Sequence, residues 1–192
     1  MENQNMSKGD NMDRIYNGRI VFYHPTRKGD GAAARFEMRL NRVGEEGYDC
    51  FFLEMAQQKG VRNGNGGNAS FDWGNKVTVK LGFMDICEFL TVLEGKARSV
   101  GGSRGSLYHQ TEGGNTLIGL SAREGGGYSL GLSRRADGGS DSRRVSICLS
   151  EVEATGLRQV LQTGIFFLSF HSSLLFRQGS ATRVESAVRN AN

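Results

Sequence analysis

Several short segments of the chain contain aromatic or basic side chains that would share one face of a β-strand. Arg19 and Tyr23, in segment 15–24, are separated by an even number of positions and would share one face of a β-strand, because strand side chains have a period of two. Tyr48 and Phe52 would share a face by the same rule. Guanidinium groups neutralise phosphates and aromatic rings stack on unpaired bases, so such a face has the chemistry to hold a single-stranded nucleic acid. The same rings could equally fill a second core or an interface between copies of the chain.

The charged residues favour the same kind of ligand. The chain has 24 Lys and Arg against 20 Asp and Glu, a formal net charge of +4 at pH 7, and no Lys follows Lys96. Arg presents a planar fork to phosphates and a flat face to bases, so this composition indicates a polyanionic partner. Lys76 and Lys80 would follow a nucleic-acid backbone along one strand or form a solvated edge. The near balance of charge through Val100 supports a different hypothesis, a module that binds a protein partner.

Two arginine pairs flank one predicted turn. Arg134-Arg135 precede the turn and Arg143-Arg144 follow it, so positive charge would gather at its tip. Asp137 and Asp141 lie between the pairs and partly cancel that charge. Trp73, the single Trp of the chain, could be a stacking platform or an anchor of a small core.

The sequence does not contain the motifs of common catalytic and metal sites. Segment 64–69 matches a dinucleotide-binding fingerprint in its glycines, but a strand rather than a helix follows it, so a hairpin loop is the better explanation. There is no P-loop lysine, H-E-x-x-H motif or nucleophile elbow. His24, His109 and His171 are scattered and lack partners at metal-ligand spacing. We therefore predict a protein that is not an enzyme, with no catalytic residue, metal site or cofactor.

Cysteine usage and hydropathy indicate where the protein works. Cys50, Cys87 and Cys148 form no C-x-x-C pair, so we expect reduced, buried thiols rather than disulfides or a zinc site. No apolar run approaches the roughly 18 residues that a spanning helix needs. Segment 1–13 has no apolar core of a secretory signal. We expect a cytoplasmic or nucleoid-associated protein that is neither secreted nor bound to a membrane.

An internal repeat organises these residues. Segments 77–85 and 145–153 align at a constant offset (145 − 77 = 68), and in both an alternating strand gives way to apolar residues at helical spacing. Ser150 with Glu153 forms a capping box at the start of the second helix. Gly82 with Asp85 forms a weaker version at the start of the first helix. Two strand-to-helix units are therefore predicted.

Each unit is predicted to have the order β-β-β-β-α. The first unit has strands at 15–24, 33–41, 48–57 and 76–81 and a helix to about residue 94; the second has strands at 106–111, 116–123, 128–135 and 143–149 and a helix to about residue 170. The fold class is α+β, with two antiparallel four-stranded sheets whose apolar faces pack on helices. Units 14–95 and 106–172 would form one domain, 14–172, between flexible tails at 1–13 and 177–192.

The second helix is apolar around more of its circumference than one small sheet can bury. Its apolar residues are Val160, Leu161, Ile165, Phe166, Phe167, Leu168 and Phe170. A partner helix is therefore expected, and with it a homo-oligomer.

Two segments resemble the Whirly single-stranded-DNA-binding proteins. Segment 16–21, Y-N-G-R-I-V, is similar to the Y-K-G-K-A-A opening of that family, with Arg19 at the position of the second Lys. Segment 71–73, F-D-W, followed by Lys76 and a strand running into a helix, is similar to the family's Y-D-W segment. The order of elements also agrees, and the resemblance spans about residues 14–172.

The chain also departs from the family pattern. Asn17 stands at the first Lys of the opening, Ile20-Val21 at the Ala pair and Phe71 at the Tyr. The second unit has more Gly than plant members, and no organelle transit peptide is evident. These departures indicate a bacterial, phage or more distant relative.

The resemblance implies a specific architecture and activity. Whirly-like proteins have two roughly perpendicular antiparallel sheets with helices packed against them, and they assemble as tetramers. They bind single strands along the sheets, between neighbouring protomers, with little sequence preference. Pur-type and kinetoplastid guide-RNA-binding proteins share the architecture, so both DNA and RNA are open as ligands.

The sequence thus predicts a Whirly-like homotetramer that coats or protects single strands, most simply DNA, in replication, recombination, repair or transcription. The alternative is a scaffold module that uses the same sheets to bind a protein partner. The predicted nucleic-acid-binding residues are Arg19, Tyr23, Arg35, Arg39, Tyr48, Phe52, Trp73, Lys76, Lys80, Tyr108, Arg123, Arg134 and Arg144.

Overall fold

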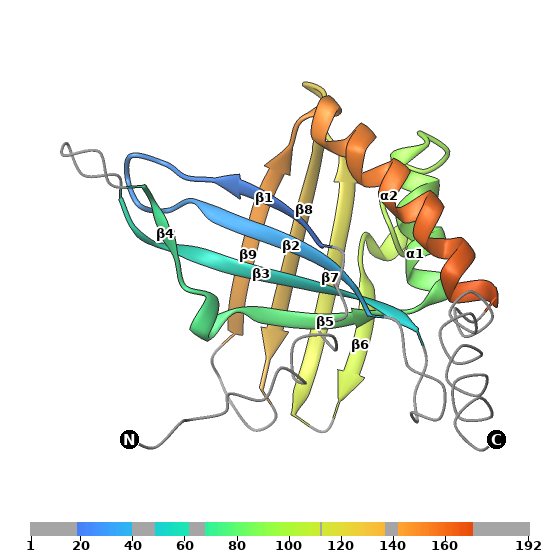
Figure 1. The fold of residues 1–192 in the computed structure, drawn as a ribbon, viewed down its shortest axis with the longest axis horizontal. Helices are drawn as coiled ribbons and strands as arrows, with labels where there is room; N and C mark the ends of the chain where they lie inside the picture. The colour runs from blue at the N-terminus through green and yellow to red at the C-terminus, as the bar shows by residue number, and fades with distance from the viewer. Residues whose placement is uncertain (1–18, 40–48, 62–67, 112, 137–141, 171–192) are drawn as a thin grey trace, which may run out of the picture.

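Two antiparallel sheets pack face to face with their strands crossing, and both helices lie together at one end of the pair (Figure 1). This computed structural model describes residues 19–39, 49–61, 68–111, 113–136 and 142–170. The Whirly-like α+β architecture predicted from the sequence is confirmed. The domain limits and both predicted tails rest on segments outside these residues and stay predictions.

The first sheet comes from the first unit and contains the four predicted strands and one more. Its elements are β1 (Arg19–His24), β2 (Ala32–Arg39), β3 (Cys50–Gly60), β4 (Ser70–Phe71), β5 (Val77–Leu81) and helix α1 (Phe83–Leu93). The strands pair in the order β1-β2-β3, and the far edge of β3 pairs with β5 near its start and with β4 near its end. Sequence pattern could not predict β4, because a strand of two residues has no periodicity.

The second sheet is a four-stranded meander from the second unit. Its strands are β6 (Leu107–Thr111), β7 (Gly114–Ala122), β8 (Tyr128–Arg135) and β9 (Ser142–Leu149), followed by helix α2 (Glu151–Phe170). Neighbouring strands pair in chain order. All four predicted strands are present, and β7 begins earlier than predicted because Gly114, with φ of 126°, pairs with Thr111 across the hairpin.

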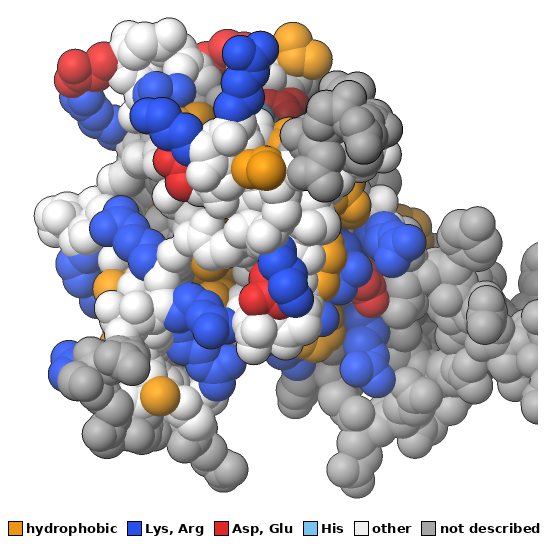
Figure 2. Space-filling view, turned by 90° about the vertical axis from the view of Figure 1, so that its left-hand side faces the viewer, with side chains coloured by type: hydrophobic (Ala, Val, Ile, Leu, Met, Phe, Trp, Pro, Cys, Tyr) orange, Lys and Arg blue, Asp and Glu red, His pale blue; other side chains and the backbone are white. Residues whose placement is uncertain are grey.

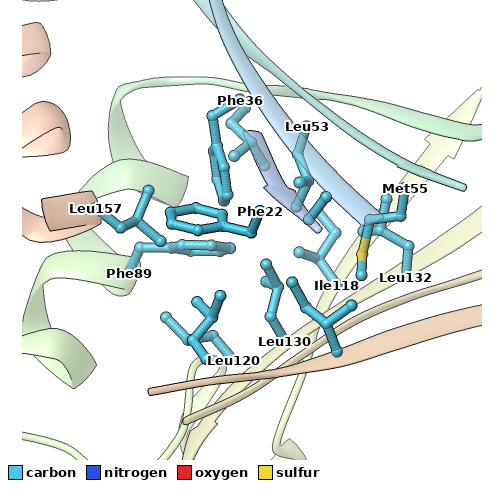
Figure 3. Close-up of a cluster of buried hydrophobic side chains, with 14 of the residues drawn as sticks. Phe22, Phe36, Leu53, Met55, Phe89, Ile118, Leu120, Leu130, Leu132 and Leu157 are labelled. Carbon is cyan, nitrogen blue, oxygen red and sulfur yellow. The ribbon is translucent and has the colours of Figure 1, made fainter. Parts of the chain in front are cut away.

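The core lies between the inner faces of the two sheets and is closed by the helices. Figure 3 shows side chains from both sheets and both helices meeting in one cluster, among them Phe36, Leu130, Phe89 and Leu157. The rings of Phe36 and Phe89 pack edge to face, with centroids 6.3 Å apart. The inner faces were predicted to pack on helices; they pack on each other as well, because the crossed sheets leave only one open end for α1 and α2.

Both helix starts have the predicted caps. Ser150 N–H donates to Glu153 Oε2 over 2.8 Å, and Glu153 N–H donates to Ser150 Oγ over 3.3 Å. In α1 only half of this exchange exists, with Gly82 N–H donating to Asp85 Oδ2 over 2.8 Å, because glycine has no hydroxyl to return the bond.

The cysteines differ from one another in burial. All three are free; Cys50 is buried, Cys87 is partly buried and Cys148 is exposed. The prediction of buried thiols is therefore right for Cys50, whose thiol pKa is raised by burial, and wrong for Cys148, which lies on the solvent side of β9. Among the described residues, no helix is long and apolar enough to cross a membrane, and no group of His, Cys, Asp and Glu has the composition of a metal site.

Candidate nucleic-acid interface

The side of the first sheet turned away from the core is the main candidate surface. We call it outer face 1, and it consists of the residues that alternate with the buried ones in β1, β2, β3 and β5. These are Arg19, Val21, Tyr23, Ala33, Arg35, Glu37, Arg39, Cys50, Phe52, Glu54, Ala56, Thr78 and Lys80.

Strand register places two basic residues, one acidic residue and one aromatic residue in a row across outer face 1. Arg19 pairs with Glu37, Glu37 with Phe52, and Phe52 with Lys80. Arg19 and Lys80 are exposed on the two outer strands, and Phe52 lies half-buried between them. With strands about 4.8 Å apart, the row is about 14 Å wide at the backbone. This arrangement can bring two cations to phosphates on either side of one stacked base.

The next row contains an ion-pair network. Arg35 Nε donates to Glu54 Oε2 over 2.7 Å, and Lys76 Nζ lies 3.0 Å from Glu54 Oε1. Burial tends to raise the pKa of the Glu54 carboxyl, but hydrogen bonds from Lys76 and Arg35 outweigh it and hold the pKa below its ordinary value. Glu54 therefore neutralises one of the two cations, so this row offers less positive charge to phosphates than the sequence suggested.

One end of outer face 1 is covered by aromatic side chains. The Arg35 guanidinium carbon lies 4.8 Å from the ring centroid of Trp73, which begins the short helix η1 (Trp73–Asn75). The rings of Tyr23 and Phe71 lie 5.4 Å apart. Ala33 and Ala56 are fully buried on this face, although they are outside the main core cluster. At this end of outer face 1 the aromatic residues form a second small core, which was one of the two alternatives from the sequence. Arg35 occupies one face of the Trp73 ring.

The predicted residues of the second unit lie elsewhere. Tyr108 and Arg144 are exposed at opposite edges of the second sheet, in a row with Leu117 and Ser133. We call this solvent side of the second sheet outer face 2; its other residues are Asn115, Gly119, Ser121, Ser129, Gly131, Arg135, Ser142, Ser146, Cys148 and Gln110. Because the sheets pack by their inner faces, the two outer faces point away from each other. The predicted residues thus do not form one continuous face.

Besides Trp73 and Lys76, which precede β5 beside outer face 1, two predicted residues that the structure describes lie on neither outer face. Arg134 alternates with the buried Leu132 and so lies on the inner side of β8, at its end. Arg123 is exposed in the turn after β7, where its N–H donates to the carbonyl of Gly127. Tyr48 is outside the described residues.

Sequence reasoning missed two participants. Glu54 was not assigned a role, although it lies two residues after Phe52 and a period of two places both on the same face. Arg143 was noted only as part of a pair, and in the structure its guanidinium donates to the carbonyl of Asn75 in η1. Figure 2 views the end of the molecule that is on the left in Figure 1, and Lys and Arg are the prevalent charged side chains there.

Comparison with solved structures supports the fold. WHY3 from Arabidopsis thaliana superposes with a TM-score of 0.63 at 16% identity, covering 87% of this chain and 97% of that one. The plant transcriptional regulator PBF-2 gives 0.62 at 16% identity over 88% of this chain and 92% of that one. A guide-RNA-binding protein complex bound to a gRNA gives 0.56 at 14% identity over 81% of this chain and 94% of that one. No protein-family model matches the chain, and no curated protein sequence matches it.

These likenesses establish the class of fold. Whirly proteins and kinetoplastid gRNA-binding proteins, two of the three groups named from the sequence resemblance, share the architecture of this chain over most of its length. The identities of 14–17% show the fold alone. They do not show the activity of this chain.

Proposed function

We propose that the chain binds single-stranded nucleic acid on outer face 1, with little sequence preference. The observation that carries the proposal is the row in which Phe52 lies between Arg19 and Lys80. Phe52 would stack on one unpaired base, worth about 1–3 kcal/mol, while Arg19 and Lys80 neutralise phosphates on either side. None of the three side chains would discriminate strongly among bases.

The shape of this surface favours single strands over duplex. A duplex hides its bases' faces, and its major groove is entered by a helix or a two-stranded ribbon that projects from a protein. In the part of the chain that the structure describes, outer face 1 is a sheet surface from which no helix projects. A single strand can instead lay its bases on the sheet. Consistent with this, one solved structure of the same fold is described as a guide-RNA-binding complex bound to a gRNA.

The finer parts of the proposal follow from the sequence resemblance. The chain would act as a homotetramer without enzymatic activity, coating or protecting unpaired strands in replication, recombination, repair or transcription. DNA is the ligand we favour, and RNA is the other member of the same ligand class. No metal or cofactor enters this mechanism.

A protein-binding role is the second candidate, and outer face 2 favours it. Leu117 and Tyr108 are 43% and 53% exposed there, beside Gly119, Gly131 and Ser146. A flat face with small side chains and two exposed apolar ones suits contact with another protein better than contact with a polyanion.

Fluorescence anisotropy with labelled single-stranded DNA, single-stranded RNA and duplex DNA, each at two salt concentrations, tests the function. We expect tight, salt-sensitive binding to single strands and much weaker binding to duplex. Arg19→Ala with Lys80→Ala should weaken binding and flatten its salt dependence, and Phe52→Ala should weaken it without changing the salt slope. Absence of binding by the parent protein would favour the protein-binding candidate.

A further inference from the structure

A groove lined by cations runs along the edge where the two sheets meet. It has a volume of about 620 Å³ and lies between the start of β5, the end of β8 and the start of β9. Its polar lining residues include Gln57, Lys76, Arg134, Arg143 and Arg144. We call this feature the basic groove.

The described lining of the basic groove is basic. Among the described residues it includes four cations, from Lys76, Arg134, Arg143 and Arg144, and no acidic residue, while Asp137 and Asp141 lie between the two arginine pairs in the chain, outside the described residues. Among the described residues, only Lys76 of these four forms an ion pair, with Glu54 at 3.0 Å. Cations gathered in one groove repel one another, and an anionic ligand relieves that repulsion.

The walls of the basic groove are held in place by bonds between the sheets. Gln57 Nε2 of β3 donates to the carbonyl of Arg144 over 3.1 Å, and the Arg143 guanidinium donates to the carbonyl of Asn75 in η1. These contacts fix the start of β9 against the first sheet. A ligand would therefore meet a formed site, which lowers the entropic cost of binding.

The position of the basic groove connects the two outer faces. Lys76 contacts Glu54, which belongs to outer face 1, while Arg144 belongs to outer face 2. A nucleic-acid strand that leaves outer face 1 at this edge would meet the cations before it reached outer face 2. Figure 2 views this end of the molecule, where Lys and Arg side chains outnumber those of Asp and Glu.

We propose that the basic groove binds the phosphodiester backbone of a single strand and turns it from outer face 1 toward outer face 2. This inference rests on the proposed function for its ligand class. The turn also adds a reason for preferring single strands, since duplex DNA has a persistence length of about 150 base pairs and cannot follow the edge of a small domain. Bases are not needed for this contact, because the described lining of the groove contains cations and no aromatic residue.

The test separates backbone contact from base stacking by using two probes of equal length. One is a labelled oligo-dT and the other a labelled chain of abasic phosphodiesters. Arg134→Gln with Arg144→Gln removes two groove cations that have no ion pair among the described residues. Arg98→Gln with Arg104→Gln is the control, since it removes the same charge from two exposed positions between α1 and β6; Arg98 is paired with Glu124 over 2.7 Å.

We expect the groove variant to lose affinity for both probes and to reduce the slope of log K against log salt by about 1.4, from about 0.7 per lost phosphate contact. The control should keep the parent slope. Arg144→Gln alone, at an exposed position, should reduce the slope by half as much; it serves if the double variant has a lowered melting temperature.

If the groove variant and the control have equal slopes of log K against log salt, the proposed role of the basic groove is wrong. The proposed function still stands in that case, provided that the parent protein binds oligo-dT. Failure of the parent to bind either probe would overturn both. Groove-dependent binding of the abasic chain, with no added affinity from bases, would support the basic groove and contradict stacking on Phe52.

Discussion

His24 Nε2 lies 2.9 Å from Glu153 Oε1, and this contact joins the end of β1 to the first turn of α2. Its counterpart is the 3.0 Å contact between His109 Nε2 in β6 and Asp85 Oδ1 in α1. Asp85 and Glu153 are equivalent positions of the internal repeat, since 153 − 85 = 68. Each helix cap is therefore held by a histidine from the first strand of the other unit, which ties the two repeats together reciprocally.

The Glu153 cap predicts an acid-sensitive part of the stability. Burial tends to raise the pKa of the Glu153 carboxyl, but hydrogen bonds from Ser150 and His24 outweigh it and hold the pKa below the ordinary value of 4.5. A carboxyl whose pKa is lowered by folding stabilises the fold above its unfolded pKa, and this contribution is lost as pH falls through the folded value.

Glu153→Gln should therefore lower the free energy of unfolding by about 1 kcal/mol at pH 7 and by much less near pH 3. Urea unfolding at both pH values measures the difference. Glu124→Gln, at a carboxylate that is 89% exposed, is the control and should have little effect at either pH. An equal loss at both pH values for Glu153→Gln would contradict the role of its charge.

The incomplete cap of α1 can be completed with the residue that caps α2 at the equivalent position of the repeat. Ser150 supplies a hydroxyl at the position that Gly82 occupies in α1, and Gly82 has φ of −88°, which any residue can adopt. A Cβ there would meet Asp85 Oδ2 at 3.8 Å, an ordinary contact.

Gly82→Ser should stabilise the protein by a few tenths of a kcal/mol, because the new hydroxyl can accept the N–H of residue 85. Thermal unfolding of Gly82→Ser beside Gly82→Ala measures the gain. The Ser variant should melt above the Ala variant, and the reverse order would show that the cap does not form.

Two glycines of the same helix should respond oppositely to alanine. A Cβ on Gly164 would lie 2.3 Å from Phe51 Cζ, and the Phe51 side chain is buried, whereas a Cβ on Gly156 would meet nothing within 4 Å. Helix propensity favours Ala over Gly by roughly 0.5–1 kcal/mol in both places.

Gly164→Ala should destabilise the fold by about 1–3 kcal/mol, because overpacking outweighs propensity, and Gly156→Ala should stabilise it. Chemical unfolding of the two single variants measures both signs. Stabilisation by both would mean that α2 can move away from β3 at little cost.

Side-chain periodicity explains what the sequence could predict and where it stopped. Alternation assigned Arg35 and Phe52 to one face, and helical spacing with the Ser150 cap located α2, because these depend on neighbours in the chain. The pairing of Arg35 with Glu54 depends on the register between β2 and β3, and alternation does not specify register. The stacking of Trp73 on Arg35 depends on how the segment before β5 folds over the sheet, which no local pattern encodes.

The surface of α2 predicts self-association. An apolar groove of about 380 Å³ lies between α2 and the first sheet, lined by Ile20, Met38, Val160 and Phe167 among others, and Val160 is 37% exposed. A second copy of the chain would cover this apolar surface, as the apolar circumference of the helix predicts, and a homotetramer would have a mass of 84 kDa (4 × 21.0).

Val160→Asp should shift the protein toward the 21.0 kDa monomer, because an assembled interface would take the new carboxylate out of water. Thr155→Asp adds the same charge at an exposed position of α2 on a different side of the helix and should keep the parent mass. Light scattering coupled to size-exclusion chromatography, at matched protein concentrations, measures both. If the parent protein and Val160→Asp both elute as monomers, the prediction of a homo-oligomer is wrong. Nucleic acid would then have to bind within one protomer.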